Sequence, residues 1–417
     1  MSYNTDNLLE EMNKIHKYSY IALFFLLYLS SGYGVGAISG TKRLLCCLLL
    51  FFFICITNLK IRMDRFIVPI GCLIVGSVST LINGEEIKQL LILLSYFILA
   101  ISFCSSNSFD ETCHAYVKVM NVICIASLVI YAIDMFAPDV LNILPQVINS
   151  AGGKHGSILL AVTPYMNRNY GMFWEPGAFQ TYILLAFIIE NFYFKAENRK
   201  RIAVLTISLI TTFSTAGYAS VMIAVVAVLL SGMLDSRMKK PTKNTIIFLI
   251  VGAIAACLII TNFYPQLAYT LFGKLEAYGQ TKDADSSTGV RVNAIIDVFK
   301  VFCQNPIFGY GKIATQNLFF EKYAHSMTTC TYANWFAFYG IFYGIAMVVG
   351  LYKFTGYFFD KKLVRLILFV SLMASITGED YANNSSILIW IFYGWDLKRY
   401  KQDTVENNYE GITNKQL

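Results

Sequence analysis

The chain has 417 residues, of which 56% are hydrophobic and only 14% are charged, and its formal net charge is +7. A soluble domain carries about 25% charged residues, so this composition excludes a soluble protein and indicates one embedded in a lipid bilayer. The basic residues form short clusters between apolar runs, which is typical of loops on anionic lipid, and we expect no nucleic-acid partner.

Apolar runs follow one another along the whole chain, and about twenty such residues suffice to cross a bilayer. They predict an all-α integral membrane protein that forms a single polytopic domain over 1–417. About twelve transmembrane helices are expected, at 18–37, 43–59, 66–82, 88–105, 116–136, 171–194, 202–215, 217–234, 245–264, 328–352, 363–378 and 385–396.

The Lys and Arg residues predict which side of the membrane each loop faces. About two thirds of them lie on the face that holds both termini, including the clusters at 195–201 and 237–243. Positive residues in short loops favour the cytoplasmic side. Both termini, including the polar tail 397–417, are therefore expected in the cytoplasm, and the opposite face is called the outer face below.

Two long segments, 137–170 and 265–327, are then expected on the outer face. Compact proteins rarely keep long irregular loops without a use for them. The second loop is predicted to hold a helix from 290 to 303, which Asn305-Pro306 ends.

The cysteine and histidine patterns give little support for a metal or a cofactor. Most of the ten cysteines lie in predicted spans and are expected to act as small buried hydrophobes. Cys303 and Cys330 lie on or near the outer face, which leaves a disulfide between them open. No CxxC or HExxH motif occurs, and His155 and His325 are far apart in sequence, so we expect no metal site and no cofactor.

Arg168 and Glu175 stand seven residues apart where the first outer loop enters an apolar span. An ionisable residue at such a place needs a partner or water and is a functional candidate. Glu175 precedes Pro176, which indicates the first turn of a helix. Two interpretations stay open: a helix cap tied to Arg168, or a carboxylate that aromatic neighbours desolvate and that accepts a proton.

The outer loops also hold the cations that could bind an anionic ligand. Arg168 and Arg291 each stand beside a predicted helix, and guanidinium groups suit phosphate oxygens. The alternative is that each pairs with a nearby acid, such as Glu175 or Asp297. His325 is either catalytic or an ordinary interfacial histidine. The secondary candidates for the site are Lys154, His155, Tyr310 and Asn334.

Four motifs within 165–350 resemble, in order, those of the O-antigen polymerase and O-antigen ligase superfamily of bacterial envelopes. They are Arg168…Gly171…Phe173…Glu175-Pro176-Gly177, the hairpin Thr212…Ser214-Thr215-Ala216-Gly217-Tyr218, Arg291 with Asn305-Pro306-Ile307-Phe308-Gly309-Tyr310-Gly311, and Asn334 with Tyr339-Gly340-Ile341-Phe342-Tyr343-Gly344.

The resemblance implies a helical bundle like that of the GT-C-like polymerases and ligases, in the bacterial inner membrane, with both long loops in the periplasm. It implies a metal-independent glycosyltransferase that uses an undecaprenyl-diphosphate-linked oligosaccharide, and a chain-length regulator protein as a further partner. By the same resemblance, Arg168 and Arg291 would hold the diphosphate, and Glu175 or His325 would receive the proton of the attacking hydroxyl.

The chain departs from the patterns of both the polymerases and the ligases. Some polymerases carry Gly eleven residues after each loop Arg, whereas positions 179 and 302 are Phe here. In ligases, a His and a polar residue are followed by nine residues and then a Gly. His325-Ser326 begins this pattern, but position 336, where the Gly would stand, is Phe. We favour a polymerase of surface polysaccharide. The alternatives are an O-antigen ligase acting on the lipid A core, and a flippase or other transporter, which should carry midplane charges and internal repeats.

Overall fold

The computed structural model describes residues 18–31, 40–57, 63–141, 143, 147–148, 154–155, 168–234, 287–323 and 328–397. These residues are almost entirely helical, in agreement with the all-α fold class. The exception among them is a short antiparallel ladder, in which Val147 pairs with His155 and Ile148 with Lys154. The span expected at 245–264 lies outside the described residues.

The elements have the following bounds: a first helix Tyr18–Ser30, α2 Gly40–Thr57, η2 Met63–Phe66, α3 Ile67–Ile82, α4 Ile87–Ser106, α5 Phe109–Phe136, α6 Pro138–Leu141, β1 Val147–Ile148, β2 Lys154–His155, α7 Pro176–Ile188, η3 Ile189–Tyr193, α8 Arg199–Thr211, α9 Thr215–Leu234, α13 Ser287–Gln304, α14 Lys312–Tyr323, α15 Thr331–Tyr339, α16 Ile341–Phe354, η5 Thr355–Tyr357, α17 Lys362–Ser375 and α18 Ser385–Tyr393.

Two described helices, α4 and α5, are long and apolar enough to cross a membrane, and four shorter helices are strongly apolar. The expected number of twelve spans is therefore not confirmed. Large apolar side chains remain exposed on several helices, for example Leu49, Ile56, Ile74 and Val122. Exposed apolar side chains of this kind are more stable against the hydrocarbon chains of lipids than against water.

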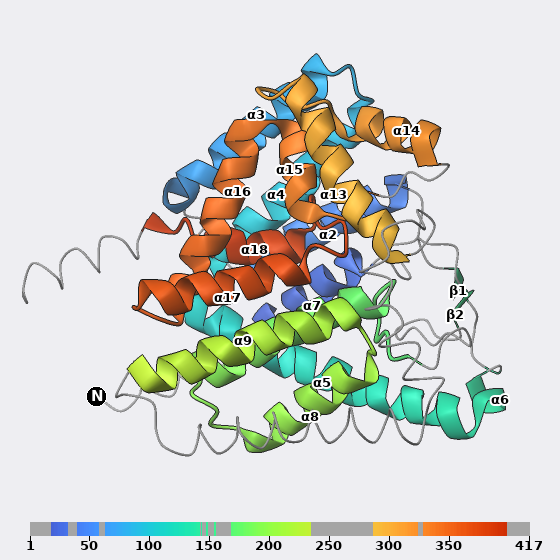
Figure 1. The fold of residues 1–417 in the computed structure, drawn as a ribbon, viewed down its shortest axis with the longest axis vertical. Coiled ribbons are helices and arrows are strands. Elements are labelled where there is room, and N and C mark those ends of the chain that lie inside the picture. The colour runs from blue at the N-terminus through green and yellow to red at the C-terminus, as the bar shows by residue number, and fades with distance from the viewer. Residues whose placement is uncertain are drawn as a thin grey trace, which may run out of the picture.

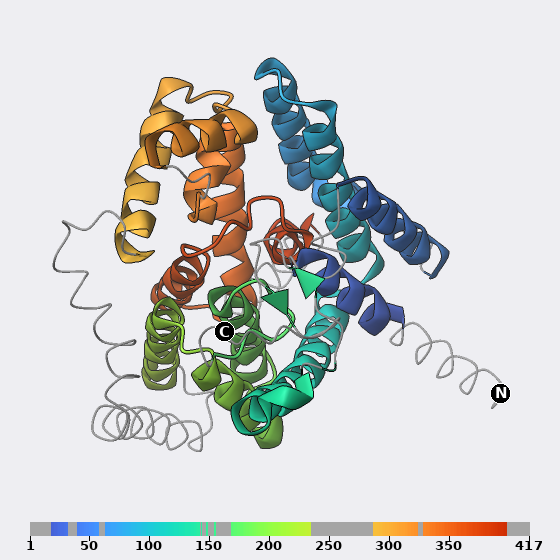
Figure 2. The same ribbon diagram turned by 90° about the vertical axis from the view of Figure 1, so that its right-hand side faces the viewer.

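The helices pack in groups, and α18 lies among them. Figure 1 shows α7, α9 and α17 running side by side, and each of them contacts the other two. In Figure 2, α18 lies between the group that contains α4 and the group that contains α16, and it packs against both. The strands, α6 and α14 lie toward the right-hand side of Figure 1.

The span expected as one helix at 328–352 is broken at Gly340 into α15 and α16. Gly340 has φ +85°, and a Cβ atom there would lie 2.0 Å from the carbonyl oxygen of Ile307. Instead, the amide of Ile341 donates to the carbonyl of Pro306 over 2.8 Å. The apolar pattern continued through this position, but the segment 305–311 packs against the backbone at the break.

At the end of the bundle that the positive residues predict to be cytoplasmic, acidic residues are held in ion pairs. Arg65 donates from Nε to Oδ1 of Asp396 over 3.0 Å and from Nη2 to Oδ2. The fully buried Glu190, in the π-helical turn η3, accepts a bond of 2.7 Å from Nη1 of Arg201. These pairs tie η2 to the end of α18, and α7 to α8.

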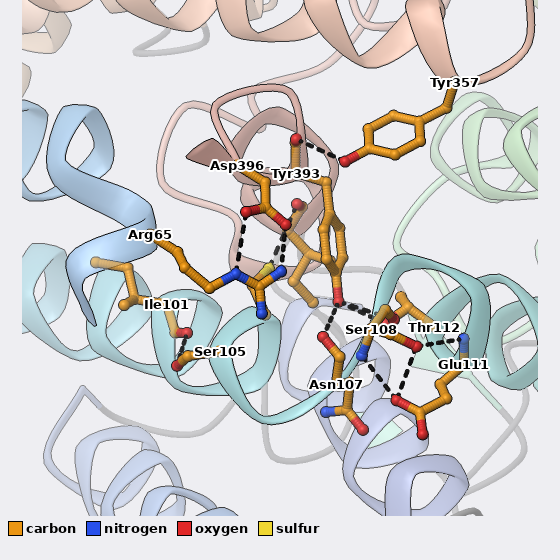
Figure 3. Close-up of polar contacts among 12 residues, drawn as sticks. Arg65, Ile101, Ser105, Asn107, Ser108, Glu111, Thr112, Tyr357, Tyr393 and Asp396 are labelled. Atoms are coloured by element: carbon orange, nitrogen blue, oxygen red, sulfur yellow. Dashed lines mark hydrogen bonds and ion pairs between the residues drawn. The ribbon is translucent and has the colours of Figure 1, made fainter. Parts of the chain in front are cut away.

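A hydrogen-bond network beside the first pair joins α5 to α18. The Tyr393 hydroxyl lies 2.6 Å from Oγ1 of Thr112 and donates to the Asn107 carbonyl over 3.1 Å. Ser108 and Glu111 form a capping box at the start of α5. Figure 3 shows this cluster next to the Arg65–Asp396 pair. The capping box starts α5 at Phe109, earlier than the start at 116 that hydropathy alone predicted.

Candidate active site

Arg168 is anchored to the hairpin between α8 and α9. Its Nε donates to the Thr212 carbonyl over 3.0 Å, and its Nη2 donates to the Phe213 carbonyl over 2.7 Å. Phe213 has φ +46°, so the chain turns sharply where these carbonyls are presented. The guanidinium therefore lies at the C-terminal end of α8, where the helix dipole favours a cation.

Glu175 occupies the N-cap position of α7, with extended backbone angles and Pro176 as the first helical residue. Its side chain makes no capping hydrogen bond to the first turn of the helix. Ahead of it, Gly171 has φ +56°, and a Cβ atom there would meet the Phe179 ring at 2.8 Å. The sequence thus predicted the cap position, whereas the carboxylate is not used to cap α7.

A second acid, Glu379, lies at the same turn of α7. It is only 5% exposed, and its Oε2 accepts a hydrogen bond of 2.7 Å from Nε1 of Trp174. A Cβ atom at Gly177 would lie 2.9 Å from Oε1 of Glu379 and 3.8 Å from Oγ of Ser214. The glycine thus lets the carboxylate and the hairpin approach the first turn of α7 together.

The two carboxylates also act on one tyrosine. Burial raises the pKa of Tyr381 well above its ordinary value of 10.0, and the negative charges of Glu379 and Glu175 add to the rise. Tyr381 lies beside the start of α7, because its hydroxyl donates to the Ala178 carbonyl over 3.5 Å and its ring lies 5.5 Å from that of Trp174. The first turn of α7 and the loop 379–384 together form an acidic site, at the end of the bundle that is expected to face outward.

Asn334 is tied to the same loop. Its Nδ2 donates to Oδ1 of Asp380 over 3.0 Å and to the Thr328 carbonyl over 2.8 Å. Oδ2 of Asp380 lies 3.7 Å from Nζ of Lys312, the first residue of α14. These contacts connect α14 and α15 to the loop that carries Glu379.

Tyr310 lies in a turn that joins three parts of the bundle. Its amide donates to the Ala337 carbonyl over 2.6 Å, and the flanking Gly309 and Gly311 have φ +72° and +86°. Ser79 at the end of α3 donates to the carbonyls of Phe308 and Phe338. The motif around Tyr310 therefore positions α14 and α15, and its described backbone contacts are structural.

Glu85 fixes the start of α14. Its Oε1 accepts a bond of 2.6 Å from the Ile313 amide, which is one of the first donors of that helix. Burial raises the pKa of the Glu85 carboxyl above its ordinary value of 4.5, while the bond to Ile313 and the charge of Lys312 oppose the rise. The loop between α3 and α4 thus holds α14 in place.

A cavity of about 480 Å³ lies beside this site. The following residues line it: Leu29, Ser30, Arg43, Lys88, Gln89, Ile92, Tyr96, Trp174, Lys312, Ile313, Gln316, Asp380, Asn383 and Asn384. Trp174 belongs both to this lining and to the contact with Glu379, so the cavity adjoins the acidic site.

The other expected site residues are placed only in part. Arg291 belongs to α13, which begins and ends close to the helix expected at 290–303, and Lys154 and His155 form β2; only their backbone is described. His325 lies outside the described residues. Cys303 and Cys330 are both free, so the disulfide considered between them is not formed.

Glu379, Asp380 and the cations of the cavity were not among the site residues predicted from the sequence. The signal that could have found the acids is Gly-Glu-Asp-Tyr at 378–381, a charged run between two short apolar spans. The cations come from three helices, and only the packing of those helices brings Arg43, Lys88 and Lys312 to one cavity.

Comparison with known proteins identifies the central part of the chain. Residues 202–352 match the O-Antigen ligase family, and no curated protein matches the chain. The match runs from α8 to α16 and includes the α8–α9 hairpin, Arg291, Tyr310 and Asn334. It supports a role in polysaccharide assembly and does not separate a polymerase from a ligase. Residues 202–352 are therefore similar to the O-antigen polymerase/ligase superfamily.

Proposed function

We propose that this protein is a surface-polysaccharide polymerase of the bacterial inner membrane. It joins undecaprenyl-diphosphate-linked oligosaccharide repeat units at the periplasmic face, as a metal-independent glycosyltransferase. The family match over residues 202–352 supports this class of function. The observation that supports a reaction centre is the acidic turn at the start of α7, where Glu175 and Glu379 lie beside the hairpin that Arg168 anchors.

The proposed reaction transfers a glycan from its lipid diphosphate to a sugar hydroxyl. The hydroxyl loses its proton as its oxygen attacks the anomeric carbon, and the bond from that carbon to the diphosphate oxygen breaks. The proton passes to a base, and the diphosphate leaves with an added negative charge. A base near the hydroxyl and cations near the diphosphate are therefore the groups that the reaction needs.

Glu175 suits the role of base because it stands at the start of α7, beside Glu379 and the hairpin that Arg168 anchors. His325 remains the alternative base. Arg168 and Arg291 are proposed to hold the diphosphate. The two carbonyl bonds of Arg168 fix the plane of its guanidinium group, and a preorganised cation stabilises developing charge better than a mobile one.

The test is a complementation experiment in a strain that lacks this gene, read on a lipopolysaccharide gel. A polymerase defect leaves the core carrying one repeat unit, whereas a ligase defect leaves bare core. We expect Arg291→Ala to abolish chain extension with the amount of protein in the membrane unchanged. Normal banding with that variant would remove Arg291 from the mechanism, and bare core after deletion would identify a ligase.

A matched pair of variants tests Glu175. Glu175→Gln should reduce extension by roughly a hundredfold or more, since a positioned general base contributes about 10²–10⁴. The control is Asp297→Asn, because the Asp297 carboxylate is held by Lys300 and Lys322 over 2.9 and 2.6 Å. Equal activity of the two variants at equal protein level would argue that Glu175 has a structural role.

A further inference from the structure

Among the described residues that line it, the cavity beside the acidic site has more cations than acids. Arg43 comes from α2, Lys88 from α4 and Lys312 from α14, and Asp380 is the one acidic residue of the described lining. Asp380 and the nearby Glu85 both act on Lys312. Among the described residues, neither Arg43 nor Lys88 has an acid within ion-pair distance. The cavity therefore has an excess of positive charge.

The rest of the lining has the groups that bind sugars. Carboxamides, which both donate and accept hydrogen bonds, come from Gln89, Gln316 and Asn383. The fourth carboxamide of the lining, that of Asn384, caps α18 by accepting from the amide and hydroxyl of Ser386. Tyr96 and Trp174 add aromatic surface. Sugar hydroxyls pair with carboxamides, and sugar rings pack against aromatic rings. A site for an inorganic phosphate would need only the cations.

Two buried polar atoms of this lining lack a hydrogen-bond partner within the described parts of the chain. They are Nε of Arg43, a donor, and Oδ1 of Asn383, an acceptor. The other ends of both side chains are engaged, since Arg43 donates to the Tyr96 hydroxyl over 3.5 Å and Asn383 donates to the Tyr339 hydroxyl over 2.6 Å. Buried polar groups without partners are uncommon, and a small adjustment around a bound ligand would satisfy both.

We propose that this cavity binds an anionic sugar unit, one that carries a carboxylate or a phosphate ester, within the glycan that the enzyme handles. The excess of cations favours a negatively charged ligand, and the carboxamides and aromatic rings favour a sugar. That this sugar belongs to a lipid-linked glycan rests on the proposed function. Trp174 connects the cavity to Glu379, so the bound unit lies next to the acidic turn of α7.

The experiment measures binding by isothermal titration calorimetry to the purified full chain in lipid nanodiscs. The probes are a glucuronate-containing tetrasaccharide, the same tetrasaccharide with its carboxylates reduced to alcohols, mannose 6-phosphate and inorganic diphosphate. We expect the tetrasaccharide or the sugar phosphate to bind and the reduced tetrasaccharide to bind at least roughly tenfold more weakly, because bonds to charged groups are the strong ones. Which of the two anionic probes binds identifies a carboxylate or a phosphate as the charged group.

Lys88→Gln is the informative variant because Lys88 is exposed and its replacement leaves the core intact. It should weaken binding of the anionic probe roughly tenfold, and Arg43→Gln should do the same. The matched control is Lys322→Gln, which removes a cation of α14 that pairs with Asp297 and lies outside the cavity lining. Its binding should equal that of the unaltered protein.

Three results would overturn the proposal. The charged and the reduced tetrasaccharide could bind equally, or no probe could bind. Inorganic diphosphate could also bind more tightly than either anionic sugar, with a binding that Lys88→Gln weakens. The proposed function is tested separately by the lipopolysaccharide gel. Binding without chain extension would reject the polymerase and keep the sugar site, and extension without binding would do the reverse.

Discussion

The two ends of the bundle use charge in opposite ways. At the end that is expected to face the cytoplasm, Arg65 and Arg201 each face a nearly fully buried acid, Asp396 or Glu190. At the opposite end, which is expected to face outward, Arg43 and Lys88 line a cavity without an acidic partner in the described chain. Matched charges in a low-dielectric setting hold helices together, whereas unmatched charges beside open space are available to a ligand. We therefore expect the pairs of Arg65 and Arg201 to contribute to stability, and Arg43 and Lys88 to be available for binding.

The largest effect is expected where a matched pair is broken. Asp396→Asn would leave Arg65 facing a neutral amide, with both side chains mostly buried, at 15% and 6% exposed. Removing one partner of a buried pair costs about 3–5 kcal/mol. We expect a clear fall in the midpoint of thermal unfolding in detergent, measured by circular dichroism.

Two controls sharpen that comparison. His114 and Asp110 form an exposed pair, so His114→Gln should change stability by less than about 1 kcal/mol. Lys88→Gln, which removes an unmatched cation, should change it by no more than about 0.5 kcal/mol. A loss for Lys88→Gln as large as that for Asp396→Asn would contradict the division between the two ends.

An intermediate effect is expected at Arg168, which combines a binding role with a structural one. Arg168→Lys keeps the charge, but an ammonium group cannot reproduce the two bonds to the Thr212 and Phe213 carbonyls in one plane. We expect a loss of about 2 kcal/mol in unfolding free energy, together with reduced chain extension. Full activity and full stability of this variant would show that only the charge matters.

The smallest effect is expected from Glu85, and it depends on pH. Burial holds the pKa of its carboxyl in the folded protein above the ordinary 4.5. The contribution of this group to stability is thus fully present below pH 4.5 and is lost as the pH rises through the folded pKa. Glu85→Gln lacks this loss, so its unfolding midpoint relative to the unaltered protein should rise between pH 4 and pH 7.5. A difference independent of pH would argue against the shift.

The sequence predicted helical segments well where apolar length decides the outcome. The runs at 66–82 and 88–105 correspond to α3 and α4 within a residue at each end. It did not predict the break at Gly340, since a glycine in an apolar run gives no sign of the backbone that approaches it. The sequence also did not predict the π-helical turn around Glu190. The acid of this turn pairs with Arg201 from another helix, and the sequence alone does not show that pairing.

The candidate site divides in the same way. Glu175 and Arg168 could be selected because both stand in one short polar segment next to a span. Glu379 reaches the first turn of α7 from a loop about 200 positions away, and Arg43, Lys88 and Lys312 come from three separate helices. Proximity of that kind depends on how helices pack, which composition and spacing do not contain.

The break between α15 and α16 has a consequence for how this protein can change over evolution. The segment around Tyr310 is attached there by main-chain bonds, from Tyr310 to Ala337, from Gly311 to Phe338 and from Ile341 to Pro306. Main-chain bonds of this kind depend on the number of residues in the segment and on the glycines that allow its turns. They leave most neighbouring side chains free to vary. Homologues could thus exchange nearly every residue around it and still present the outer loop at the same angle, whereas a single inserted residue would misalign it.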